Sequence, residues 1–228
     1  MRDNWEVCVA TTRLLLLPYR RHFVPTYHGW MSDPSLLAAT CSERLSEAEE
    51  YAAQASWASD PSKCTFIVFE RAAHEAGGCP LSGHAAGMCG DVNLFLLDAA
   101  AVAADYFGGA EGAAGGAAEV MVMIAEARFR RRGFAGEAVR ALLRYGAEAL
   151  GLRRFVAKVG EQNAPSLALF AKLGFREAKR VAAFEEVHLG WEWAGAAAGA
   201  GGGWELLPCP DPAAAAGASG AEEALKTS

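Results

Sequence analysis

The chain has 228 residues, of which 52% are hydrophobic and 21% charged, and a formal net charge of −6 at pH 7. This length suits one packed domain with short appendages, and the acidic balance argues against a protein that binds nucleic acid over its whole surface. The six cysteines form no C-x-x-C or C-x-x-H pair, so no metal site is expected.

The sequence favours a cytoplasmic protein without a membrane partner. Its first residues, MRDNWEVCVATTR, lack the apolar core of a secretion signal. The apolar run LLLLP at residues 14–18 is far too short to span a bilayer. Cysteines dispersed through a chain of this size are typical of reduced, partly buried thiols.

Alternating strand and helix patterns predict an α/β (α+β) fold with one central sheet. Runs rich in β-branched, aromatic or other apolar residues predict strands, in chain order, at 13–17, 65–69, 91–97, 119–125, 155–159 and 187–193. Helical patterns between them cover residues 20–39, 46–57, 133–150 and 166–173. Ser46 and Glu49 mark the start of the second helix, because they have the spacing of a capping box.

Two segments stand apart by composition. Residues 99–117 are rich in Ala and Gly, and residues 194–228 combine Ala and Gly with Pro and a charged end. Such compositions bury too little apolar surface to offset the ordering of their backbone. We therefore interpret 99–117 as a flexible loop insertion, although alanine favours a helix over part of 99–104. The expected packed domain is 1–193, followed by a linker and disordered tail at 194–228.

The stretch RFRRRGFAGEAV, residues 128–139, connects an apolar strand to the long helix, and four of its first five residues are arginines. Gly133 allows a tight turn, and the free N–H groups at a helix start attract anions. Neither the G-K-[ST] of a nucleotide P-loop nor the dinucleotide pattern G-x-G-x-x-G is present. The stretch therefore predicts a phosphate-binding turn; a solvated basic turn or a localisation patch is the alternative.

Two motifs give this turn a context. Arg130-x-x-Gly133-x-Ala135 resembles the R/Q-x-x-G-x-G/A signature of the GNAT superfamily of N-acetyltransferases, in which the turn cradles the pyrophosphate of acetyl-coenzyme A (acetyl-CoA). About thirty residues further on, NAPSLALFAKLGF at 163–175 is similar to the second block of that family. The resemblance covers about residues 13–193. It implies the GNAT fold, a mixed and twisted sheet of about six or seven strands flanked by helices.

Within the superfamily, the segments LPYRRHFVPTYHGWM, CTFIVFE, GDVNLFL and EVMVMIAE are similar to a eukaryotic branch related to the RimJ/RimL type of protein N-terminal acetyltransferases. This resemblance implies acetyl transfer from acetyl-CoA to a primary amine of a protein, α-amino or lysine, by direct attack in a ternary complex without a metal. An acetyltransferase for small-molecule amines, and a non-catalytic module that binds CoA or a protein, are the alternatives.

The resemblance also assigns cofactor-binding residues. Main-chain groups of Met123, Ile124 and Ala125 would bond the pantetheine arm of acetyl-CoA, and Asn163, followed by Ser166 in the second block, would hold the arm from the other side. Asn163 is alternatively only a helix cap. The pyrophosphate would lie on a turn made of Arg130, Arg131, Arg132, Gly133, Phe134, Ala135 and Gly136.

A general base has to remove a proton from the amine. Histone-acetylating members of the superfamily have a glutamate at the position of Glu119, eleven residues before Arg130, so Glu119 is the predicted base. It is alternatively a strand-end residue that faces water or pairs with an arginine. Asp91 and Glu43 are weaker candidates, supported only by position. Phe170 stands where many relatives have a tyrosine that protonates the departing thiolate, so no acid is assigned.

Overall fold

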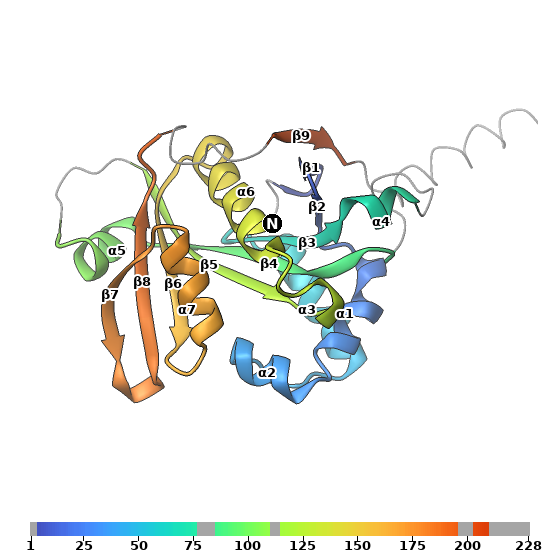
Figure 1. Cartoon of the computed structure of the whole chain (residues 1–228), viewed down its shortest axis with the longest axis horizontal. Coiled ribbons are helices and arrows are strands. Elements are labelled where there is room, and N and C mark those ends of the chain that lie inside the picture. Colours follow the sequence, from blue (N-terminus) through green and yellow to red (C-terminus); the bar gives the residue numbers. More distant parts are fainter. Residues whose placement is uncertain (1–3, 77–84, 110–114, 196–202, 210–228) are drawn as a thin grey trace, which may run out of the picture.

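The computed structural model describes residues 4–76, 85–109, 115–195 and 203–209 (Figure 1). Its strands are β1 (Val7–Thr11), β2 (Leu14–Pro18), β3 (Lys63–Glu70), β4 (Met88–Leu97), β5 (Gly116–Ile124), β6 (Leu152–Gly160), β7 (Arg176–Val181), β8 (Glu186–Glu192) and β9 (Trp204–Pro208). Its α-helices are α1 (Val24–Trp30), α2 (Pro34–Thr40), α3 (Glu47–Ser59), α4 (Arg71–Ala76), α5 (Ala99–Tyr106), α6 (Phe134–Ala149) and α7 (Ala164–Lys172). Short 3-10 helices are η2 (Arg21–Phe23), η3 (Ala127–Phe129) and η4 (Ala182–Phe184).

The nine strands within the described ranges form one mixed sheet in the order β7-β8-β6-β5-β4-β3-β2-β1-β9. Only the neighbours β5 and β6 are parallel in this sheet, and every other neighbouring pair is antiparallel. The mixed α/β fold is thus confirmed, with more strands than the six or seven expected. The additional strands β1, β7 and β9 are not among the six that the sequence pattern locates.

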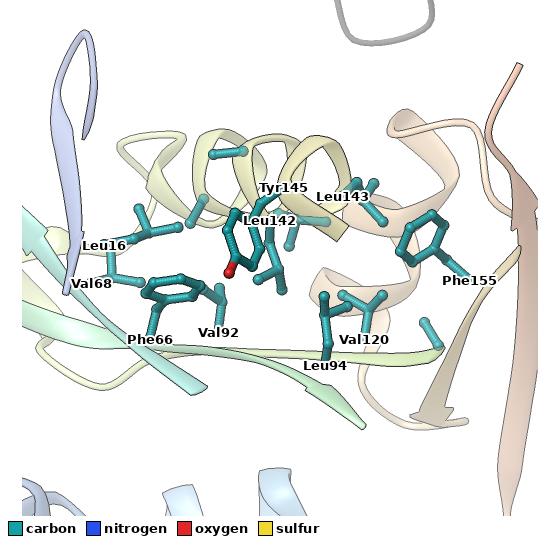
Figure 2. Close-up of a cluster of buried hydrophobic side chains, with 14 of the residues drawn as sticks. Leu16, Phe66, Val68, Val92, Leu94, Val120, Leu142, Leu143, Tyr145 and Phe155 are labelled. Atoms are coloured by element: carbon teal, nitrogen blue, oxygen red, sulfur yellow. The ribbon is translucent and has the colours of Figure 1, made fainter. Parts of the chain in front are cut away.

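One face of the sheet packs against α6, whose apolar stripe is visible in the sequence. Figure 2 shows this core, in which side chains rise from the strands toward the helix: Phe66, Val68, Val92, Leu94 and Val120 face Leu142, Leu143 and Tyr145. Tyr145 meets Phe66 edge-on, with ring centroids 5.3 Å apart. Such aromatic pairs add to the stabilisation that burial provides. The helix that begins at the arginine turn is therefore fixed firmly to the sheet.

The opposite face of the sheet is covered by η2 and α1–α3 and carries a second apolar cluster, which includes Phe23, Tyr27, Trp30, Phe69 and Met123. The pattern at residues 20–39 predicts one helical stretch, but it is divided here. Asp33 caps α2 by accepting a hydrogen bond from the Ser35 amide at 2.8 Å. The predicted capping box at the start of α3 is confirmed, because Ser46 and Glu49 make both reciprocal bonds.

Residues 99–106, at the start of the segment interpreted as a flexible loop, are the helix α5 rather than a loop. Asp98 caps the helix by accepting a hydrogen bond from the Ala101 amide at 2.7 Å. Val102 is buried against Ala117 and Val156. The high helix propensity of alanine and the burial of Val102 together stabilise this helix. Their stabilisation exceeds the backbone-ordering cost expected from the glycines of the segment. Residues 110–114 of the predicted insertion lie outside the described residues.

Strand β9 lies within residues 194–228, for which the composition predicts a linker and tail. It pairs antiparallel with all five residues of β1, from Val7 opposite Pro208 to Thr11 opposite Trp204. The guanidinium of Arg144 lies over the Trp204 ring, 4.6 Å from its centroid. The C-terminal segment therefore contributes an edge strand, while residues 196–202 and 210–228 lie outside the described residues.

Candidate active site

The two parallel strands at the centre of the sheet separate partway along their length. Residues from Gly116 to Glu119 of β5 pair with residues from Leu152 to Val156 of β6. Beyond Glu119, β5 continues beside β4 as far as Ile124, and β6 continues beside β8 as far as Gly160 (Figure 1). Within the described residues, the β6-facing edge of 120–124 therefore has no ladder partner. An extended group with amides can bind such an edge as an added strand.

On its other side, β5 presses closely against Gly90 of β4. A Cβ atom at Gly90 would lie 1.8 Å from the carbonyl oxygen of Met123, a distance that no side chain tolerates. The carbonyl of Cys89 accepts hydrogen bonds from the amides of both Ala125 (2.9 Å) and Glu126 (3.3 Å). Gly90 thus allows the backbone of β5 to take the course that carries it into the turn before α6.

The separation of β5 and β6 beyond Glu119 is called the splay below. The turn between β5 and α6 places an uncapped helix start at the open end of this splay. Arg131 and Gly133 both have positive φ, +60° and +81°. Gly133 is the N-cap residue of α6, and no side chain of the described residues caps this end. The first amides of a helix have no intrahelical acceptors and carry the positive end of the helix dipole. This turn therefore offers unpaired amides and the positive end of a helix dipole to an anion, while phosphate binding here stays a prediction.

The four arginines of the turn have different environments. Arg130 fastens the turn to the end of β5 by donating to the carbonyls of Ile124 (2.9 Å) and Ala125 (2.8 Å). Arg132 forms an ion pair with Glu70 at 2.5 Å. Arg128 lies 3.9 Å from Glu126 and over the ring of Phe129. Arg131 is exposed and, within the described residues, makes no hydrogen bond or ion pair. Arg131 is thus the member of the group whose donors face solvent.

Asn163 occupies the position before α7, and the alternative interpretation of it as a helix cap is confirmed. Its Oδ1 accepts a hydrogen bond from the amide of Ser166 at 3.2 Å. Cap formation uses only that oxygen, so the Nδ2 donors are left for another partner. Phe170 is buried against Phe175, with ring centroids 5.0 Å apart. It therefore packs in the core and has no hydroxyl with which to protonate a departing thiolate.

The predicted base Glu119 lies beside the point where β5 and β6 separate. Its Oε2 is 2.6 Å from Nζ of Lys158 on β6, and 16% of its side chain is exposed. Burial alone would lower the pKa of Lys158, but the hydrogen bond and charge of Glu119 outweigh burial and raise it above its ordinary value. The pairing anticipated as an alternative is thus present, with a lysine instead of an arginine. The role of Glu119 as base stays a prediction.

The two weaker candidates differ sharply in environment. Glu43 is exposed in the segment between α2 and α3. Asp91, on β4 opposite Met123, is 3% exposed. Asn93 donates from Nδ2 to Oδ2 of Asp91 at 2.6 Å, while the other oxygen, Oδ1, has no partner within the described residues. Burial raises the pKa of Asp91 to about 6, and the Asn93 bond offsets this only in part.

Comparison with known proteins agrees with this geometry. The profile of the acetyltransferase (GNAT) domain family matches residues 13–176. The chain belongs to the GNAT acetyltransferase family. It is 40% identical over 189 residues to an N-acetyltransferase 9-like protein of Nematostella vectensis, covering 83% of this chain and 87% of the relative. It is 39% identical over 190 residues to the human alpha/beta-tubulin-N-acetyltransferase 9, covering 83% and 84%.

Solved GNAT structures share the fold of this GNAT domain. The spermidine N-acetyltransferase of Vibrio cholerae, solved in complex with CoA and spermine, superposes with a TM-score of 0.61 at 16% identity, covering 79% of this chain and 96% of that one. Family membership makes the chain an acetyl-CoA-dependent acyltransferase. Within the described ranges, no helix is long and apolar enough to cross a bilayer, and no three His, Cys, Asp or Glu residues gather as metal ligands would.

Two residues at the turn of the GNAT domain are missed by sequence reasoning. A Cβ atom at Gly136 would lie 3.7 Å from Nη2 of Arg140, so this exposed arginine bends back toward the helix start. The i, i+4 spacing from Gly136 is the available signal. Arg13, just before β2, donates to the carbonyl of Arg132 at 2.9 Å. Nothing in the local sequence indicates that contact, because more than a hundred residues separate the partners.

Glu137 ties the first turn of α6 to the loop between β1 and β2. Its carboxylate accepts hydrogen bonds from the Thr11 hydroxyl (2.7 Å), the Arg13 amide (3.0 Å) and Nε of Arg13 (2.7 Å). Burial alone would raise the pKa of Glu137, but these bonds outweigh it and lower the pKa below the ordinary value. A carboxyl with a lowered pKa stabilises the folded state above its unfolded pKa, and this stabilisation is lost as the pH falls through the folded pKa.

We expect Glu137→Gln to lower the free energy of unfolding by about 1–2 kcal/mol at pH 7, because charge-assisted hydrogen bonds are lost and Arg13 is half exposed. The difference from the wild type should shrink as the pH falls below about 4.3, the ordinary pKa of glutamate, and on through the lowered pKa of the folded carboxyl. Urea denaturation at pH 7 and at about pH 3.5 measures both quantities. A loss of equal size at the two pH values would contradict the assigned role of the charge.

Proposed function

We propose that this GNAT domain transfers the acetyl group of acetyl-CoA to a primary amine of a protein by direct attack in a ternary complex. The observation that carries the proposal is the continuity of two features. The unpaired edge of β5 at 120–124 leads directly into an uncapped helix start at Gly133. A molecule with an amide-containing arm and a pyrophosphate at one end matches both.

The residues fit acetyl-CoA as follows. The pyrophosphate would take the free amides at the start of α6, with the exposed guanidinium groups of Arg131 and Arg140 adding positive charge. Gly136 presents no side chain to this surface. The pantetheine arm would lie along the free edge of β5, and Nδ2 of Asn163 would donate to it from the α7 side. Arg130 would act indirectly, by holding the turn onto the carbonyls of β5.

The bound thioester supplies an acetyl group that is already activated for attack by an amine. A thiol with a pKa of about 8.5 leaves readily, so the absence of a hydroxyl at Phe170 is compatible with turnover. The acceptor amine would approach on the face of the sheet covered by α1–α3, because strand alternation directs Asp91, Glu119 and Met123 to that face. Both candidate proton acceptors are therefore on the side from which the amine would come.

The acceptor is proposed to be a tubulin. The human relative at 39% identity carries alpha/beta-tubulin in its name, and its alignment covers 84% of that protein. A small polyamine is the less favoured acceptor, because the spermidine enzyme shares only the fold at 16% identity. The acidic net charge also agrees with a reaction in which the acceptor contributes a cationic amine.

A competition experiment tests the class of acceptor. The wild-type chain is incubated with acetyl-CoA, spermidine and an equimolar pool of peptides that have free α-amino groups and lysines. We expect acetyl groups on the peptides, at least about ten times more than on spermidine, when both are measured by mass spectrometry. Acetylspermidine with unmodified peptides would contradict the proposal. Separate counting of α-amino and lysine acetylation also determines which kind of amine is used.

A further inference from the structure

A group of buried polar side chains lies between the sheet and α1–α3. Asp91 and Asn93 alternate onto the same face of β4, and Thr65 of β3 is in register with Asn93. Within the described residues, Asp91 Oδ1 and Asn93 Oδ1 have no hydrogen-bond partner although both residues are at least nine-tenths buried. The hydroxyl of Tyr19 is also buried and unpartnered there. Buried acceptors without donors are rare, and their cost is commonly associated with a functional site.

The buried polar group lies beside the splay, where the reactive end of the pantetheine arm is proposed to lie. Asp91 is directly opposite Met123 on β5, and Asn93 is opposite Met121. In the proposed binding mode, the pantetheine arm runs from the turn along the free edge of β5, and its reactive end lies near Met123 and Met121. Asp91 and Asn93 therefore lie beside that end, on the α1–α3 face of the sheet from which the acceptor is proposed to approach. An amine offers N–H groups, which are the donors that the two unpartnered oxygens need.

Glu119 is less suited to take a proton from the amine than its family position suggests. Its carboxylate is held at 2.6 Å by the ammonium of Lys158, whose raised pKa keeps that group charged. Oε2 of Glu119 is therefore already occupied by a hydrogen-bond donor before any amine arrives. Glu119 also lies opposite Phe95, four residues along β5 from Met123 and farther from the turn. Lys158 and Glu119 thus compensate each other's charge, and their ion pair links β5 to β6 at the point where the two strands separate.

We propose that Asp91 is the catalytic base, receiving the proton of the acceptor amine at Oδ1. This inference rests on the proposed acetyl transfer. In the step, the lone pair of the amine nitrogen forms the C–N bond, the C–S bond breaks with its electron pair on sulfur, and the N–H proton moves to Asp91. The thiolate leaves with coenzyme A, and Asp91 releases its proton to water after the product has gone. Asn93 is a positioning residue, because its Nδ2 holds Oδ2 and orients Oδ1.

The electrostatic surroundings match this role. Tyr19 and Tyr27 are close enough to Asp91 to be influenced by its charge, and the pKa values of both hydroxyls are raised, first by burial and also by nearby carboxylates. Glu50 of α3 faces the same two tyrosines, and burial raises its pKa as well. The pKa of about 6 for Asp91 is closer to that of an α-amino group, about 8, than to that of lysine, about 10.4. A general base is most effective when its pKa lies near the operating pH, and burial brings the pKa of Asp91 closer to neutral pH.

Activity measurements compare wild type with Asp91→Asn and Glu119→Gln, using the peptide pool as acceptor. We expect Asp91→Asn to reduce kcat/KM by about 10²–10⁴-fold, the usual share of general base catalysis. The acid limb of the wild-type pH profile should vanish in Asp91→Asn and persist in Glu119→Gln. Loss of the limb in Glu119→Gln, with its retention in Asp91→Asn, would overturn the proposal.

Asn93→Ala supplies a second variant that leaves the carboxyl in place. The Asn93 bond lowers the pKa of Asp91, so its removal should raise that pKa and move the acid limb to higher pH. An unmoved limb in Asn93→Ala would overturn the proposal. The coenzyme A-induced rise in melting temperature should be kept in all three variants. Wild type that binds coenzyme A without acetylating any amine would refute the proposed function instead.

A readout without cofactor comes from melting temperatures of the apo protein between about pH 4 and pH 7. Because the pKa of Asp91 is raised on folding, the folded state binds this proton more tightly than the unfolded state. The stability that the group contributes is present at low pH and lost as the pH rises through about 6. Asp91→Asn avoids this loss, so its melting temperature relative to wild type should rise from pH 4 to pH 7. A pH-independent difference would show that Asp91 does not titrate there and would overturn the proposal.

Discussion

Gly133→Val should abolish the rise in melting temperature that coenzyme A produces in the wild type. Ligand at 100 times its Kd stabilises a protein by about 2.7 kcal/mol, which for a chain of this size corresponds to a rise of about 5–10 °C. A valine at Gly133 would have φ near +81° and would put a branched side chain over the amides that we assign to pyrophosphate. The nearest atom to a Cβ there is Nη2 of Arg13 at 3.5 Å, so the apo fold has room for the change.

Gly151→Val is the matched control for that experiment. Gly151 follows the other end of α6, has φ of +67°, and a Cβ atom added to it would have no neighbour within 4 Å. Both variants should lose about 1–2 kcal/mol of stability through left-handed backbone strain. Only Gly133→Val should lose the coenzyme A response, measured by thermal denaturation with and without ligand. Equal responses in the two variants would place the cofactor elsewhere.

Gly90→Ala should be the most destabilising small substitution at the site. The added Cβ would lie 1.8 Å from the Met123 carbonyl oxygen and 2.9 Å from Cα of Ile124, and both are backbone atoms that cannot rotate away. Overpacking of this kind usually costs about 1–3 kcal/mol and here should cost about 3 kcal/mol or more. The shift of β5 should also weaken coenzyme A binding. Urea denaturation and the coenzyme A-dependent melting shift measure the two effects.

The corresponding control is Gly160→Ala at the end of β6, where a Cβ meets no atom within 4 Å. Its free energy of unfolding should stay within about 0.5 kcal/mol of the wild type, as for most surface substitutions. If Gly90→Ala were as stable as Gly160→Ala, the close approach of β4 and β5 would be absent in solution.

The parts of the fold that are predictable depend on local patterns. The capping box at Ser46 lies within four residues, and the apolar stripe of α6 repeats within one helix, so both can be identified without tertiary structure. Strand β9 cannot, because its partner β1 is nearly two hundred residues away and its own composition resembles a tail. The alanine-rich helix α5 cannot be identified locally either, because it is stabilised by burial of Val102 against strands that come later in the chain. The glycines that follow the helix suggest a loop instead.

In the candidate site, too, local sequence patterns predict some features, whereas others depend on contacts between distant segments. Local spacing is enough to locate Gly133 and the arginine turn, because an uncapped helix start is a feature of consecutive residues. Sequence reasoning could not distinguish the arginines from one another: Arg130 is committed to strand carbonyls, whereas Arg131 is exposed. It also could not find Lys158 beside Glu119, since this contact requires the parallel pairing of β5 with β6.

The most direct test of acetyl transfer to a protein amine is mass spectrometry of α/β-tubulin incubated with acetyl-CoA and the purified chain. Wild type and Gly151→Val should add acetyl groups to tubulin amines at similar rates, and Gly133→Val should leave tubulin at the background of an enzyme-free sample. Unmodified tubulin with the wild-type chain, under conditions in which coenzyme A raises its melting temperature, would contradict transfer to this acceptor. Equal acetylation by Gly133→Val would contradict the site.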